Sequence, residues 1–145
     1  MIACDGRDDA AEFAEIRGAM KVLEMTDQDI WDVLKILASI LHMGNISYKA
    51  DDVNDSANIP EQNNVERAAF FLGVGKQEFV RLAVGKRISK KNLDFFRALT
   101  SKTIRVHGDT VTSAITSNQS RDVRDAFAKG IYGRLFIHIV KVSSK

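Results

Sequence analysis

A chain of 145 residues with 45% hydrophobic content is long enough to bury a core within one domain, or within part of one. Its formal net charge of +2 argues against binding to nucleic acid or to a membrane surface through a strong electrostatic field. Cys4 is the single cysteine, which excludes an internal disulfide and favours a reducing, cytosolic setting. The sequence holds no apolar run of membrane-spanning length and no signal peptide, so membrane insertion is not expected.

The N-terminal region is predicted to form a turn and then a helix. Gly6 lies in the turn, and Asp8 or Asp9 is expected to cap the helix that follows. Apolar residues recur over residues 10–25 at a spacing that predicts a helix: Phe13, Ile16, Met20 and Leu23.

A second helix is predicted to begin at a near capping box in residues 26–29, where Asp29 takes the place of the usual glutamate. We expect it to run to Met43 and to end through a left-handed residue at Gly44 or Asn45. The residues expected to face the core are Ile30, Val33, Leu34, Leu37, Ile40 and Leu41.

The middle of the chain is predicted to be irregular. Residues 46–50 alternate in polarity like a short strand, and residues 51–64 read as a polar surface loop. Asn64 is expected to cap a helix over residues 65–72, and a further short helix is expected over residues 93–99. Between them lies a basic cluster, interpreted as a solvated loop or, alternatively, as a contact for an acidic partner: Lys86, Arg87, Lys90 and Lys91.

Two β-rich runs follow, at residues 102–106 and 111–115. The four residues between them, 107–110, read HGDT, and either Gly108 or Asp109 is free to adopt a positive φ. This pattern predicts a β-hairpin.

The C-terminal part is predicted to be one long, mostly buried helix over residues 117–142. One apolar row has strict four-residue spacing: Val123, Phe127, Ile131, Leu135 and Ile139. A second row lies beside it: Ala128, Tyr132, Phe136 and Val140. Ser117 or Ser120 is expected to cap this helix, and Gly130 and Gly133 are interpreted as positions where a neighbouring element approaches closely.

Residues that could carry chemistry have simpler explanations. His42 has no second histidine nearby, and His107 and His138 show no metal-ligand spacing, so His42 is interpreted as structural. Residues 73–76 (GVGK) lack the spacing and the hydroxyl residue of a phosphate-binding loop. The acidic residues within 5–9 do not have the spacing of an EF-hand. We therefore predict no catalytic, cofactor-binding or metal-binding residue in this chain.

Three segments resemble the motor heads of myosins. Residues 124–136 (RDAFAKGIYGRLF) resemble the RDALAK-xIYxxLF signature, and residues 36–46 (ILASILHMGNI) resemble ILAxILHLGNI. Residues 13–23 resemble the FxxIRxAMxVL helix of the same family. The motifs occur in family order over nearly the whole chain, and their wording is closest to unconventional myosins of class VII.

The chain departs from this family pattern at three places. Glu24 stands where the family usually has glycine, so the end of the first helix is expected to be less sharply defined. Residues 75–89 exceed the family length and are interpreted as an insertion or a gene-model artefact. Residues 142–145 replace the usual continuation of the long helix, and we hypothesise that they are read-through past an exon end.

The resemblance implies a fold that is mainly α with a small β-hairpin. Residues 1–145 would be a fragment of the P-loop NTPase-type motor head between switch I and switch II, in the upper fifty-kilodalton subdomain that forms one wall of the actin-binding cleft. The implied partners are the actin filament and the remainder of the head, in the cytoplasm on the actin cytoskeleton.

The complete motor would use ATP and Mg²⁺. This chain contains no phosphate-loop, switch I or switch II sequence, so we expect no ATP binding or hydrolysis by the chain alone. The alternative interpretation is a stand-alone, non-enzymatic helical interaction module.

The resemblance also makes the hairpin the so-called cardiomyopathy loop, which contacts actin. The family carries a fixed acid or a phosphorylatable hydroxyl 16 residues before the aspartate of the RDALAK-like motif, and this register gives Asp109, at the expected hairpin tip. Turn propensity is the simpler explanation for an aspartate there. The residues expected to bind actin are Arg105, His107, Gly108, Asp109 and Thr110.

Overall fold

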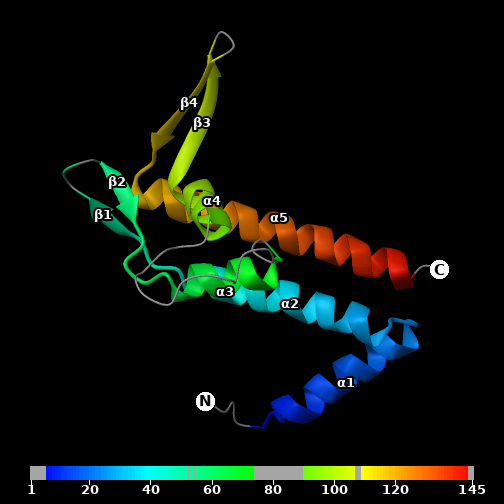
Figure 1. Ribbon diagram of the computed structural model, residues 1–145. Coiled ribbons are helices and arrows are strands. Elements are labelled where there is room, and N and C mark those ends of the chain that lie inside the picture. Colours follow the sequence, from blue (N-terminus) through cyan, green and yellow to red (C-terminus); the bar gives the residue numbers. More distant parts are fainter. Residues whose placement is uncertain (1–5, 52, 54, 74–89, 107–108, 144–145) are drawn as a thin grey trace.

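The computed structural model describes residues 6–51, 53, 55–73, 90–106 and 109–143, and its architecture is mainly α, as predicted (Figure 1). The helices are α1 (Asp9–Val22), α2 (Asp27–Gly44), α3 (Asn63–Phe71), α4 (Lys90–Thr100) and α5 (Ser117–Ser143). Two antiparallel strand pairs join them: β1 (Lys49–Asp51) with β2 (Ser56–Asn58), and β3 (Ser101–Val106) with β4 (Asp109–Ala114). None of the described helices combines the length and apolarity needed to cross a membrane.

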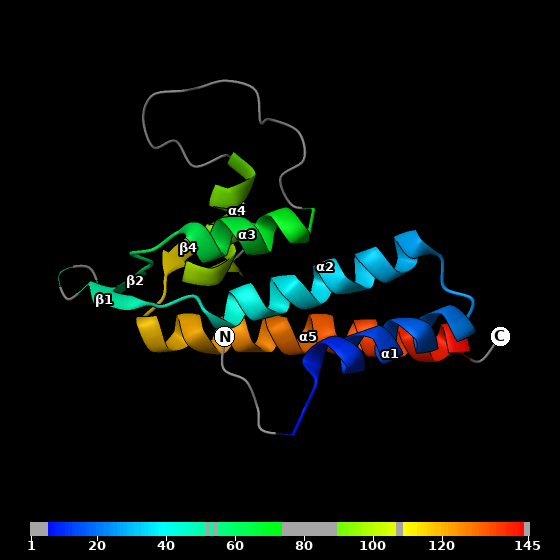
Figure 2. The ribbon, with the colours of Figure 1, turned by 90° about the horizontal axis from the view of Figure 1, so that it is seen from below.

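Helices α2 and α5 lie side by side and form the long axis of the molecule (Figures 1 and 2). Helix α3 packs on α2, and α4 packs on both α3 and α5. At one end, α1 diverges from α2, and at the other end the β3–β4 hairpin projects away from the helices (Figure 1).

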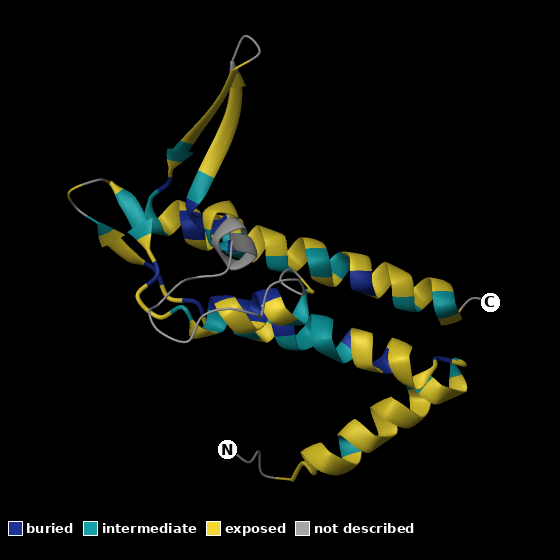
Figure 3. Ribbon diagram, in the orientation of Figure 1, coloured by how far each residue is buried: buried dark blue, intermediate teal, exposed yellow. Residues whose placement is uncertain are grey.

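The main core lies where the C-terminal end of α2 meets α3 and α4, and buried residues concentrate there (Figure 3). Its members are Met43, Ile46, Tyr48, Ile59, Val65, Ala68, Ala69, Phe95 and Leu99. A smaller cluster near the start of α2 consists of Met25, Ile30, Val33 and Leu135. The N-terminal half of α5 closes the main core, with the Phe127 ring 6.0 Å from that of Phe95.

Much of the expected apolar surface is exposed in this chain. Helix α5 is one long helix, as predicted, but the expectation that it is mostly buried is wrong, because within the described residues only Ser120 and Leu135 of it are buried. Helix α1 forms as predicted but has no buried residue, since it diverges from α2, and its Phe13 and Ile16 are exposed. Leu41 of α2 is also exposed rather than in the core.

Two predictions for α5 are corrected in detail. Its first turn is capped by Thr116 rather than by a serine: the Gln119 amide donates to Thr116 Oγ1 (3.3 Å), and the Thr116 amide donates to Gln119 Oε1 (3.1 Å). A Cβ atom added at Gly130 or Gly133 would meet no atom within 4 Å among the described residues. Neither glycine therefore marks a close approach by another of the described residues. Of the atypical C-terminal residues 142–145, Val142 and Ser143 form the last residues of α5.

The capping box of α2 is confirmed, since Thr26 and Asp29 exchange side-chain and backbone hydrogen bonds of 3.0 and 3.2 Å. The left-handed end predicted for this helix is wrong: Asn45 has a φ of −89°. A side chain from α3 contacts this end instead, because Asn64 Nδ2 donates to the Asn45 carbonyl (3.2 Å). Asn64 therefore does not cap α3, whose N-cap is Gln62.

The strand predicted at residues 46–50 lies further along the chain, at β1. Ile46 and Tyr48 are buried in the main core instead. The predicted loop contains β2, which pairs with β1, so the described residues hold a second antiparallel strand pair besides the predicted hairpin. Residues 75–89, with Lys86 and Arg87, lie outside the described residues.

The end of α1 is sharply defined, contrary to expectation. Asp8 caps its start, accepting hydrogen bonds from the amides of Ala10 and Ala11. At the other end, Glu24 adopts a left-handed φ of 58°. The Glu24 amide donates to the Lys21 carbonyl, and the Met25 amide donates to the Met20 carbonyl. These two bonds form a Schellman motif, in which glycine is the favoured left-handed residue.

We predict that Glu24→Gly stabilises the chain by about 0.5–1 kcal/mol, because it removes the steric cost of the left-handed conformation. Chemical denaturation of the purified chain measures the change. The control is Glu15→Gly, an exposed position inside α1, where the same substitution should destabilise by a similar amount. Destabilisation by glycine at both positions would contradict the conclusion that Glu24 is held in a left-handed conformation that glycine favours.

Candidate functional site

The β3–β4 hairpin is the element in which the predicted site residues lie. Its strands pair without a break from Ser101 opposite Ala114 to Val106 opposite Asp109. Residues 107 and 108, which follow β3 in the sequence, lie outside the described residues. Asp109 is the first residue of β4, where it pairs with Val106.

The register assigns the hairpin side chains to two faces, because directly paired residues share a face and successive residues alternate. Thr103 and Thr112 share one face, here called the inner face because it is turned toward Arg97 and Ala98 of α4. Their Oγ1 atoms are 3.2 Å apart. The opposite face is called the outer face. Ile104 and Val111 form the middle of the outer face, with 49% and 54% of their surface exposed.

The predicted site residues are divided between these faces. Arg105 and Thr110 pair with each other on the inner face, whereas Asp109 lies on the outer face with the exposed pair Ile104 and Val111. His107 and Gly108 lie outside the described residues. The sequence analysis did not select Ile104 and Val111, although the alternation of each strand contains the signal that would have found them.

The base of the hairpin is fixed by backbone hydrogen bonds through one buried residue. The Ile115 amide donates to the Thr100 carbonyl at the end of α4 (3.1 Å), and the Ile115 carbonyl accepts from the Ala57 amide in β2 (2.9 Å). Ile115 is only 4% exposed, so these bonds are shielded from water. The hairpin is thereby joined to α4 and to the β1–β2 pair.

Arg124 of α5 joins the long helix to the same region. Its Nη1 donates to the Ile46 carbonyl (2.8 Å), its Nη2 is 2.7 Å from Oδ1 of Asp125, and its guanidinium lies 5.8 Å from the centre of the Tyr48 ring. Burial raises the pKa of Tyr48 to about 12, and the charge of Arg124 partly opposes this shift. The buried Tyr48 hydroxyl has no hydrogen-bond partner among the described residues.

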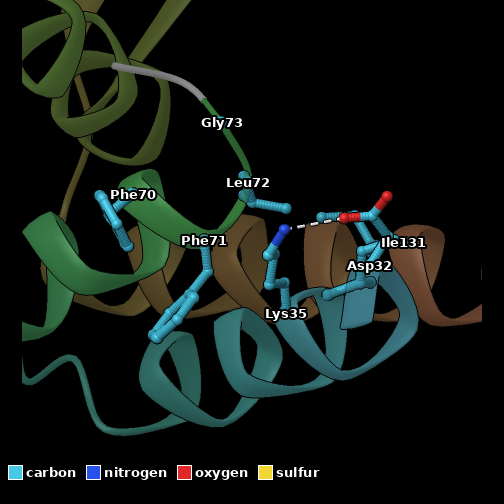
Figure 4. Close-up of a pocket in the computed structure, with 8 residues that line it drawn as sticks. Asp32, Lys35, Phe70, Phe71, Leu72, Gly73 and Ile131 are labelled. Carbon is cyan, nitrogen blue, oxygen red and sulfur yellow. Dashed lines mark hydrogen bonds and ion pairs between the residues drawn. The ribbon is translucent and has the colours of Figure 1, made fainter. Parts of the chain in front are cut away.

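An apolar hollow of about 450 Å³ lies between α2, α3 and α5 (Figure 4). Phe70, Phe71 and Ile131 line it, and at its edge Lys35 pairs with Asp32 at 2.9 Å. Because Lys35 and Asp32 form an ion pair with each other, a molecule in the hollow would meet mainly apolar side chains.

His42 contacts two side chains of α3. Its Nδ1 lies 3.2 Å from Oδ1 of Asn64, and its ring stacks on Phe71 at 5.7 Å. Among the described residues, no group of three or more histidine, cysteine or acidic side chains is arranged to hold a metal ion.

We predict that Arg124→Lys destabilises the chain by about 1–3 kcal/mol, because lysine lacks the planar fork that bonds the Ile46 carbonyl while covering Tyr48. Denaturant unfolding followed by circular dichroism measures the loss. Arg121→Lys, on the exposed surface of the same helix, should change stability by less than about 0.5 kcal/mol. Equal unfolding midpoints for the two variants would show that the Arg124 contacts contribute little.

Comparison with known proteins identifies the family. The sequence model of the myosin head (motor domain) family matches residues 1–145. The chain is 51% identical over 142 residues to the myosin-VIIa of Drosophila melanogaster, covering 97% of this chain and 6% of that protein. It is 38% identical over 142 residues to the unconventional myosin heavy chain 6 of Caenorhabditis elegans, and 37% identical over 137 residues to the unconventional myosin-VIIb of Mus musculus.

These alignments cover 97%, 97% and 94% of this chain, respectively, and in each case 6% of the relative's length. The match extends over all of the helices and both strand pairs described above. The chain therefore belongs to the myosin head (motor domain) family and is a class VII-like part of a motor domain.

Proposed function

We propose that this chain is part of an actin-based, ATP-driven motor, in which it contributes the upper wall of the actin-binding cleft and contacts actin through the β3–β4 hairpin. The observation that carries the proposal is the hairpin itself, in a chain of the myosin head family. It projects from the helices, as Figure 1 shows, while its base is fixed through Ile115. An exposed element on a fixed base is suited to contacting a partner without losing its own position.

The chemistry of the motor is assigned to other parts of the protein. Phosphoryl transfer depends on a phosphate-binding loop, a bound Mg²⁺ and a residue that positions the nucleophile. None of the sequences of these loops occurs among the 145 residues of this chain. ATP and Mg²⁺ would therefore bind elsewhere in the head, and the role of this chain would be to contact the filament. A cytoplasmic location on the actin cytoskeleton belongs to the same proposal.

The exposed apolar surface favours part of a head over a stand-alone module. Tyr132, Phe136 and Val140, the exposed members of the second row of α5, have 55%, 59% and 44% of their surface exposed. Phe13 and Ile16 of α1 are exposed to a similar degree. A row of large apolar side chains on two helices is unfavourable in water, and further protein packed against it would remove that cost.

Within the hairpin, Asp109 is the residue proposed to carry the fixed negative charge. It is exposed, and it lies opposite Val106 in the last pair of the hairpin that the structure describes. A charge in this position remains hydrated in the free head and is available to a partner that approaches the end of the hairpin. Such a charge acts mainly on the rate and the specificity of association.

We predict that Asp109→Asn, in the complete head, raises the actin concentration needed for half-maximal ATPase activation by about three- to tenfold at low ionic strength. Basal ATP hydrolysis should remain unchanged, because the nucleotide loops lie outside this chain. The control is Asp122→Asn, which removes an exposed acid from α5 and should leave actin activation unchanged. Equal activation of the wild type and Asp109→Asn would contradict the proposed role of Asp109.

A further inference from the structure

Both strands of the β3–β4 hairpin are joined closely to helices. Helix α4 ends at Thr100, and β3 begins at the next residue, Ser101. Two residues, Ile115 and Thr116, connect the end of β4 to the start of α5. Because each residue has only two freely rotating backbone angles, the angles of this short junction set the direction of the hairpin relative to α5.

Every backbone donor and acceptor of this two-residue junction has a partner. The amide and carbonyl of Ile115 bond α4 and β2, as described above. The Thr116 carbonyl accepts from the Ser120 amide (2.9 Å), and the Thr116 amide donates to Oε1 of Gln119 (3.1 Å). A rotation of the junction would break one or more of these four bonds, so the junction resists rotation.

Gln119 makes the one bond of the four that comes from a side chain. Its own amide donates to Thr116 Oγ1 (3.3 Å), so the two residues form a reciprocal capping box at the start of α5. Gln119 is exposed and belongs to neither core cluster. A change of its side chain therefore removes the bond to the Thr116 amide without opening a cavity.

The length of the hairpin amplifies a small movement at this junction. Each strand has six residues, which corresponds to a length of about 20 Å. A rotation of about 10° at the base would displace the far pair, Val106 and Asp109, by about 3 Å. The conformation of the junction therefore decides where the far end of the hairpin lies.

We propose that Gln119 is a positioning residue: by holding the Thr116 amide, it fixes the direction of the β3–β4 hairpin relative to α5. Gln119 acts through the backbone of the junction and not by touching a partner. The direction of the hairpin is a property of this chain, whereas its consequence for actin rests on the proposed function.

The chain offers a matched control in the capping box of α2. There the Thr26 amide donates to Oδ2 of Asp29 (3.0 Å), at the end of the molecule opposite the hairpin (Figure 1). Asp29→Ala therefore removes an equivalent bond far from the junction, and Gln119→Ala removes the bond at the junction. Gln119→Glu should retain that bond, because glutamate also serves in such a box. Thermal unfolding of the three variants establishes that the head is folded.

The first measurement is the distance distribution between spin labels at Val111→Cys and Lys129→Cys, both exposed, in the complete head with its other cysteines replaced. We expect one narrow distribution with Gln119, with Gln119→Glu and with Asp29→Ala. Gln119→Ala should broaden the distribution by about twofold, because the junction loses one of its four bonds. An unchanged width in Gln119→Ala, or equal broadening in Gln119→Glu or Asp29→Ala, would overturn the inference.

The second measurement is the actin-activated ATPase of the unlabelled heads. We expect Gln119→Ala to raise the actin concentration for half-maximal activation by about two- to fivefold, because binding must then order the hairpin. Gln119→Glu and Asp29→Ala should behave like the wild type. A broadened distance distribution in Gln119→Ala, with unchanged activation in both Gln119→Ala and Asp109→Asn, would support the positioning role and contradict the proposed function. Weaker activation of Asp109→Asn with an unchanged distribution in Gln119→Ala would overturn the positioning role and leave the proposed function intact.

Discussion

The arrangement of this chain depends on the two hydrogen bonds of the Ile115 backbone. They join three elements that are distant in sequence: the end of α4, strand β2, and the turn from β4 into α5. Because Ile115 is buried, its amide and carbonyl would be left without partners if either element moved away. The direction of the hairpin is therefore coupled to the packing of the main core rather than to its own strands alone.

Arg124 extends this coupling to the long helix. It is one of the few residues of α5 with a side chain that is mostly buried, at 16% exposed, and it bonds the segment that follows α2. Beyond it, α5 runs along α2 with most of its surface exposed. The N-terminal half of α5 thus closes the main core, whereas its C-terminal half contributes Leu135 to the smaller cluster and leaves Tyr132, Phe136 and Val140 exposed.

The local features of the fold could be predicted from sequence because their causes are local. The caps at Asp8 and at Thr26 depend on residues within one helical turn, and both are confirmed. The hairpin was also predictable, from two β-rich runs and a short connection. The family motifs likewise lie in continuous stretches of sequence.

The errors arose where a distant residue decides the outcome. Asn64 was expected to cap its own helix, but it bonds the end of α2 instead. Helical periodicity identified the apolar rows of α5 but could not show what covers them, and here most of that surface is open. For the candidate site, the sequence selected the hairpin. The division of its residues between two faces required the strand register, which only the paired structure supplies.

The central claim is that the β3–β4 hairpin is the part of this chain that meets actin. Amide hydrogen exchange of the complete head, with and without actin filaments, tests it most directly. We expect slower exchange on actin binding in peptides spanning residues 101–114, and unchanged exchange in α1, at the opposite end of the molecule. Unchanged exchange over residues 101–114 in the actin-bound head would contradict it.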